Sequence, residues 1–212
     1  MDPFNLIIIL AGAALVPFLA VVATSYIKIA VVLMLVRNAL GVQQIPPNIA
    51  LNALAIILTG YVMAPVAVQT YDILTQPDIE FATIENIENA YDRGKVPIIE
   101  FFNKHADERE RSFFLRATNE LWPPELSDRV NENSLAIMLP AFTVTQLREA
   151  FEIGFLLYLP FIVIDLIVSN ILLAMGMMMV SPLTISLPFK LFLFVTVDGW
   201  SRLLLGLVKT YT

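Results

Sequence analysis

The stretch that decides the fold is residues 153–189, which read IGFLLYLPFIVIDLIVSNILLAMGMMMVSPLTISLPF. Asp165 is the only charged residue in this stretch. An α-helix rises about 1.5 Å per residue and the hydrocarbon core of a bilayer is about 30 Å thick, so about 20 apolar residues are enough to cross it. The stretch therefore predicts an all-α protein whose helices lie in a membrane.

Three further apolar segments surround a polar insert. Their charged residues are few: Lys28 in residues 3–36, none in residues 38–71, and Asp198 and Arg202 in residues 191–208. Residues 72–132 instead hold 14 acidic and 7 basic residues, which is 21 of the 32 charged residues of the chain. We therefore predict a hydrophobic helical hairpin over residues 1–71, a polar, mostly helical insert over residues 72–146, and a second hydrophobic helical hairpin over residues 147–212.

The composition excludes several classes of protein. The chain is 58% hydrophobic and 15% charged with a mean hydropathy of +0.74, far more apolar than a soluble domain. Its net charge of −6 argues against nucleic-acid binding. It has no cysteine and one histidine, His105, which lies in the charged insert and is most simply a solvated surface residue. The sequence contains neither HExxH nor GxSxG, so we expect no enzyme, no metal site and no cofactor.

The charges also predict an orientation. The chain begins Met1-Asp2-Pro3 without the basic residues of a cleavable signal, so we expect the first helix to be retained. Lys28 and Arg37 flank a loop at residues 41–48, and Lys190 follows the turn at residues 177–188. The positive-inside rule then places both turns in the cytoplasm and the insert and both termini outside.

Local signals predict where helices bend or stop. Three of the four apolar segments contain proline, which removes a backbone donor, and we expect kinks or interruptions at Pro17, Pro65, Pro160, Pro182 and Pro188. In the insert, Ile84, Ile87 and Tyr91 share one helical face. A second insert helix is expected to start near Pro97, to continue through Phe114 and Leu115, and to end at Pro123-Pro124.

The last apolar segment is a poor independent span. Lys190, Asp198 and Arg202 would together cost roughly 8 to 10 kcal/mol if all three lay deep in lipid, and the apolar residues return about 4 to 8 kcal/mol. Asp198 and Arg202 are four residues apart, where they can pair on a helix. A site walled by neighbouring protein helices suits this segment better than lipid.

Asp165 lies in a helical packing stripe. Residues at alternating spacings of four and three mark a seam between helices: Leu147, Phe151, Gly154, Tyr158, Phe161, Asp165 and Val168. A buried carboxylate needs a partner, and the nearest cation across the following turn is Lys190. A structural ion pair is favoured, within or between subunits; a proton relay and a solvated carboxylate without a role are the alternatives.

The turn after this helix carries four methionines in five residues, Met175-Gly176-Met177-Met178-Met179. Thioether side chains are unbranched and polarisable, and they adapt to surfaces of different shape. The simple interpretation is core filler. The cluster at a turn between Gly176 and Pro182 alternatively indicates a gate or an adaptable contact surface.

Several runs of residues resemble the FliP/SctR family, the export-gate proteins of the bacterial flagellum and of type III secretion injectisomes. The matching runs are residues 37–41 (RNALG), 44–48 (QIPPN), 147–155 (LREAFEIGF), 159–165 (LPFIVID), 175–179 (MGMMM), 185–191 (ISLPFKL) and 193–200 (LFVTVDGW). The resemblance covers essentially the whole chain. Flagellar members usually carry a cleavable signal, so the absence of a basic start favours the injectisome branch.

The resemblance implies a subunit that forms a pentameric ring with two smaller gate subunits, the S (FliQ-like) and T (FliR-like) components, around a central pore in the bacterial inner membrane. Unfolded secreted proteins would pass through it, and other export-apparatus proteins would be partners. The family further implies that Met177, Met178 and Met179 form a pore gasket, that Asp165 and Lys190 form an important ion pair, and that the assembled core projects toward the periplasm.

Two other functions are weighed against the gate. A flagellar export-gate subunit is the near alternative. A transporter of a small solute or of protons, using Asp165, Lys190, Asp198 and Arg202, is the more distant one, and such a protein would move its solute when reconstituted alone.

Overall fold

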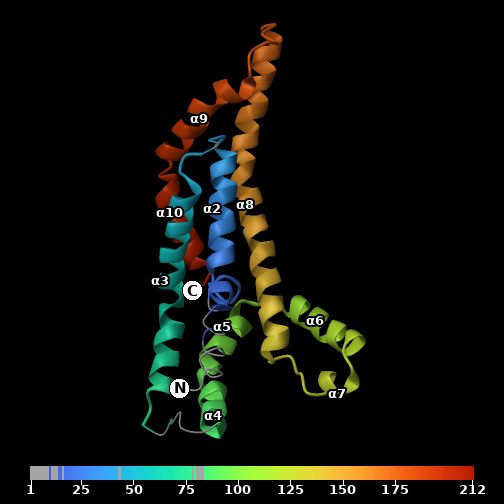
Figure 1. Ribbon diagram of the computed structural model, residues 1–212. Coiled ribbons are helices and arrows are strands. Elements are labelled where there is room, and N and C mark those ends of the chain that lie inside the picture. The colour runs from blue at the N-terminus through green and yellow to red at the C-terminus, as the bar shows by residue number, and fades with distance from the viewer. Residues whose placement is uncertain (1–9, 11–13, 16, 43, 78, 80–83) are drawn as a thin grey trace. The chain divides into compact units, whose positions relative to one another are not determined.

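The computed structural model describes residues 10, 14–15, 17–42, 44–77, 79 and 84–212, and this part of the chain is helical with no strand (Figure 1). The all-α prediction is therefore confirmed, whereas the prediction for Met1-Asp2-Pro3 lies outside the described residues. The chain divides into two compact units. One contains Met1–Ile27 and Gly60–Leu147, and the other contains Lys28–Thr59 and Arg148–Thr212. These units cut through two long helices, so the charge-based boundaries at residues 71 and 146 stay a prediction.

The unit around the insert is built from short helices: α4 (Ile84–Gly94), α5 (Val96–His105), α6 (Glu108–Leu121) and α7 (Pro124–Ser127). Phe102 and Phe142 pack with ring centroids 4.7 Å apart and form its core. Pro97 sits in the first turn of α5, as expected. Ile87 and Tyr91 are exposed on α4, and the side chain of Ile84 lies outside the described part of the chain.

The single helix expected from Pro97 through Leu115 is wrong. The chain leaves the helix at Ala106, and Asp107 starts α6 by accepting a hydrogen bond from the Arg109 backbone N–H at 2.8 Å. An aspartate is a good N-cap because its carboxylate satisfies a backbone donor that the first turn leaves free. The Asp107 backbone N–H in turn donates to Thr145 Oγ1 at 3.0 Å, which fixes the break against the next long helix.

The other unit contains most of α2 (Tyr26–Ala39), the first part of α3 (Asn48–Leu74), most of α8 (Leu135–Ala174), and all of α9 (Pro182–Thr196) and α10 (Gly199–Lys209). Figure 1 shows α9 returning from the end of α8 and α10 following it after a break. α8 and α2 meet closely: a Cβ added to Gly154 would lie 2.3 Å from Leu35 Cδ1, so a larger residue would require the Leu35 side chain to shift.

Within the described residues, α3 and α8 are long and apolar enough to cross a membrane. α9 and α10 meet the same criterion only as a pair, and they are bent by 62°. The helices α3, α8 and α9 do not end at Pro65, Pro160 and Pro188, whereas Pro182 starts α9. The residue before Pro17 lies outside the described part of the chain, and the expected kinks stay a prediction. The bend lies instead at Asp198, whose φ of 53° is left-handed.

The length of α8 sets a further constraint. Its 40 residues make a helix about 60 Å long, which is about twice the thickness of a hydrocarbon core. Part of α8 must therefore lie outside the hydrocarbon region of any bilayer that it crosses.

The corner between α9 and α10 depends on a glycine. Phe194 packs between Phe161 and Trp200, with ring centroids 6.4 and 5.3 Å away. A Cβ added to Gly199 would lie 2.4 to 2.7 Å from the Phe194 ring. Because the ring is held on two sides, it has little room to move away.

We predict that Gly199→Ala destabilises this corner by about 1 to 3 kcal/mol, the usual cost of overpacking. The matched control is Gly206→Ala on the same helix, where an added Cβ meets nothing within 4 Å and alanine favours the helix. Thermal unfolding of the detergent-solubilised proteins measures both. Equal melting temperatures for the two variants would contradict the packing argument.

Candidate pore turn and buried ion pairs

The methionine turn is built by the end of α8. Gly176 has a φ of +73°, its N–H donates to the Leu173 carbonyl at 3.0 Å, and the Met177 N–H donates to the Leu172 carbonyl at 3.0 Å. These two bonds form a Schellman motif, which closes a helix and needs a residue that tolerates positive φ. Pro182 then starts α9. The turn is therefore defined by backbone bonds, and its methionine side chains take no part in holding it.

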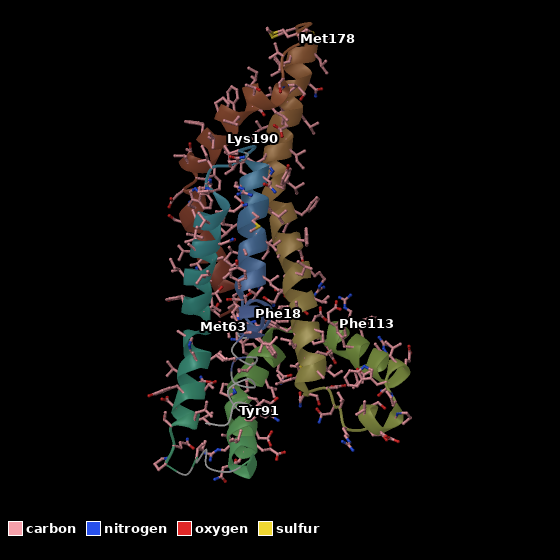
Figure 2. All side chains as sticks on the ribbon, viewed as in Figure 1. Phe18, Met63, Tyr91, Phe113, Met178 and Lys190 are labelled. Carbon is pink, nitrogen blue, oxygen red and sulfur yellow. The ribbon has the colours of Figure 1, made fainter. Side chains whose placement is uncertain are left out.

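The three predicted gasket residues project from this turn. Met177, Met178 and Met179 are 43%, 81% and 99% exposed, and Figure 2 shows Met178 at the tip of the chain segment that follows α8. The interpretation as core filler is therefore wrong for Met178 and Met179 in this subunit. Flexible apolar side chains that protrude from a fixed turn can close on a partner surface and repack around a different one.

An ion pair joins the two helices on either side of the methionine turn, α8 and α9. Lys190 Nζ donates to Asp165 Oδ2 at 2.6 Å, and Ser186 Oγ donates to Asp165 Oδ1 at 2.6 Å. Lys190 Nζ also donates to the Ala39 carbonyl, at 3.2 Å, at the end of α2. Lys190 is only 2% exposed, so the Asp165 carboxylate and the Ala39 carbonyl take the place of water around its ammonium group. The structure thus brings the two residues predicted to pair into direct contact within one subunit.

This network connects three helices through one side chain. Gly41, with a φ of +77°, follows α2, and a Cβ there would lie 3.8 Å from Lys190 Nζ. The chain therefore turns away from α2 directly beside the ammonium group. Both carboxylate oxygens of Asp165 accept hydrogen bonds, one from Lys190 and one from Ser186.

Sequence reasoning missed a second ion pair, in which the lysine is buried and the glutamate is partly exposed. Lys28 on α2 is 1% exposed, and its Nζ donates to Glu149 Oε2 on α8 at 2.8 Å. The same ammonium lies 3.9 Å from the centroid of the Tyr211 ring, a cation–π contact. The sequence did indicate that Lys28 needs a partner, because it is the only charged residue in its apolar segment. It did not indicate which residue, because Glu149 lies 121 residues away.

The expected pair between Asp198 and Arg202 is not formed in the part of the chain that the structure describes. Asp198 Oδ1 instead accepts from Ser201 Oγ at 3.0 Å. The prediction assumed that both residues are helical, but Asp198 is the left-handed residue that precedes α10. The spacing of four therefore does not place the two side chains together.

The predicted seam on α8 is realised in part. Gly154, Phe161 and Val168 are buried at intervals of seven residues, whereas Leu147 and Phe151 are exposed. Large apolar side chains on other faces of this half of α8 are also exposed: Phe155, Leu156, Leu159, Val163, Leu166, Ile167 and Ile171. A single chain thus leaves this helix largely uncovered, and lipid or other protein chains must cover it.

Nothing in the described residues forms a group of three or more His, Asp or Glu side chains that could hold a metal ion. The described residues instead form an exposed methionine turn after α8, and ion pairs connect α8 to α9 and to α2. Their charged residues neutralise one another and hold helices together.

Comparison with known proteins gives matches over almost the whole chain. The model of the FliP family matches residues 9–207. "Yop proteins translocation protein R" of Yersinia pestis is 58% identical over 210 residues, which cover 99% of this chain and 97% of that protein. "Probable translocation protein y4yL" of Sinorhizobium fredii is 53% identical, over 98% and 93% of the two chains. "Virulence protein YscR" of Salmonella typhimurium is 44% identical, over 100% and 98%.

We predict that Asp165→Asn destabilises the protein far more than Glu152→Gln on the exposed face of the same helix. Removing one partner of a fully buried pair costs about 3 to 5 kcal/mol, and the cost here is smaller because Asp165 is partly exposed. Thermal unfolding in detergent checks this. Lys190→Met in the Asp165→Asn background is expected to recover part of the loss, because it removes the uncompensated ammonium; no recovery would contradict a direct pair.

Proposed function

This chain belongs to the FliP family, and from that premise we propose that it is a core subunit of the type III secretion export gate of an injectisome, forming the inner-membrane channel through which unfolded proteins are exported. The observation that carries the proposal is near full-length identity of 44 to 58% to proteins named for translocation or virulence. A match across the whole chain, and not across one motif, supports the same role for the whole subunit.

The methionine turn supplies the mechanism that we propose for gating. Met177, Met178 and Met179 of several subunits would meet around the pore and exclude water and ions. Because thioether chains are flexible and make no directional contacts, they would separate and repack around an unfolded chain of any sequence. The Schellman turn at Gly176 and the α8–α9 ion pair would hold the base of this seal in place.

The proposed assembly is a pentamer with the S (FliQ-like) and T (FliR-like) subunits, joined by other export-apparatus proteins. The exposed apolar face of α8 supports extensive contacts with other chains. The length of α8 supports a core that rises from the membrane toward the periplasm, because a helix about 60 Å long exceeds the hydrocarbon core.

The proposal assigns no catalytic activity to the chain. A proton or small-solute transporter would need a titratable group in reach of a water path. In this structure both oxygens of Asp165 accept hydrogen bonds from Ser186 and Lys190, which favours a structural role.

Deleting the gene from the bacterium that carries it tests the function. We expect loss of injectisome-dependent protein secretion into the medium with swimming motility retained, and recovery of secretion when the wild-type gene is returned. Secreted proteins are quantified by immunoblot. Loss of motility with secretion unchanged would assign the chain to the flagellar branch, and no change in either would refute an export role.

Replacing Met177, Met178 and Met179 together by Ala is expected to make the assembled gate leak ions, because three small side chains cannot fill the seal. Replacing all three by Leu keeps apolar bulk and is the matched control, with little leak expected. Ion flux is measured in cells that express the complete gate. A tight alanine variant with unchanged secretion would contradict the gasket role.

A further inference from the structure

The α9–α10 corner forms one wall of a half-open apolar cavity that the proposed gate mechanism does not use. Its volume is about 570 Å³, within the range of small-molecule sites, and it lies between α2, α8, α9 and α10. Its walls are formed mainly by aliphatic and aromatic side chains, among them Val36, Leu157, Phe161, Leu193, Leu203 and Leu207. Apolar side chains that face such an opening lack packing partners on that side, so an apolar occupant would stabilise the fold.

Water is a poor occupant. A buried water needs two to four polar partners, and the polar side chains in this lining are those of Arg202 and Thr210. The Thr210 hydroxyl already donates to the Leu207 carbonyl at 2.7 Å. The interior therefore suits a hydrocarbon chain.

An exposed charged residue of the lining, Arg202, indicates the chemistry of the other end of the ligand. Leu203 and Leu207 are buried on one face of α10, whereas Arg202 and Gly206, four residues apart, are exposed on another. Arg202 makes no ion pair or side-chain hydrogen bond with any residue that the structure describes. A free guanidinium beside an apolar cavity complements an anionic head group, and its fork of donors fits a phosphate.

We propose that this cavity binds one acyl chain of an anionic phospholipid, whose phosphate is held by Arg202 at the mouth. A protein helix fits less well. A helix with its side chains is about 10 to 12 Å wide, so the cavity would accept little more than one turn of it. The proposal requires only that these helices meet the bilayer, so it can fail while the gate function stands.

Gly206 provides the variant that closes the site. Gly206 lines the cavity and a Cβ there meets nothing within 4 Å, so the side chain of Gly206→Leu has room to occupy part of the cavity. Gly60→Leu on α3 is the matched control, because a Cβ there also meets nothing within 4 Å and the residue does not line the cavity. Arg202→Gln removes the charge from an exposed position and leaves the cavity walls intact.

The experiment is native mass spectrometry of the full chain, purified in mild detergent and incubated with equimolar phosphatidylglycerol and phosphatidylethanolamine. The wild type and Gly60→Leu are expected to retain phosphatidylglycerol roughly tenfold better, the usual value of a charge-assisted contact. Arg202→Gln should lose this preference while still retaining lipid, and Gly206→Leu should retain neither lipid. No lipid on the wild type, or equal retention by all four proteins, overturns the proposal.

A second measurement separates lipid from a protein occupant in the assembled complex. A photoreactive diazirine amino acid is placed at Leu203, which lines the cavity and is buried, and native membranes are irradiated. A phospholipid adduct supports the proposal. An adduct to another polypeptide, with none to lipid, overturns it.

Discussion

Burying charge in apolar helices is the constraint on which the rest of this structure depends. Lys190 and Lys28 are almost fully enclosed, and each would be untenable without an acid on α8. Asp165 and Glu149 supply those acids, and the two pairs fix α8 to α9 and to α2. Because one removed partner would leave an isolated charge, the register of these helices is coupled to charge neutrality and not to apolar packing alone.

The sequence predicted best the features that depend on short runs of residues or on the distribution of charge along the chain. The four apolar segments, the polar insert and the family resemblance followed from charge spacing and from runs such as LREAFEIGF; the family resemblance and the helical class are confirmed. The contact between Asp165 and Lys190 could be anticipated because one turn separates their helices. The partner of Lys28 could not, because its position 121 residues away depends on tertiary packing.

The misjudged features share a cause. Helix-period reasoning treats each position as helical, so it joined α5 to α6 across Asp107 and paired Asp198 with Arg202. Both aspartates are residues at which the chain leaves helical geometry and starts again. The prolines end fewer helices than expected: α3 and α8 continue through Pro65 and Pro160, because a helix can lose one backbone bond and continue.

The Schellman turn at Gly176 has a consequence for how variation in this chain is interpreted. The backbone bonds of Gly176 and Met177 close the turn without any side chain, so folding places almost no demand on what residues 177–179 carry. A survey of variants scored by protein abundance would therefore find these positions silent and Gly176 intolerant. Changes at the three methionines are therefore nearly free of folding constraints, so selection on them acts through whatever their exposed side chains contact.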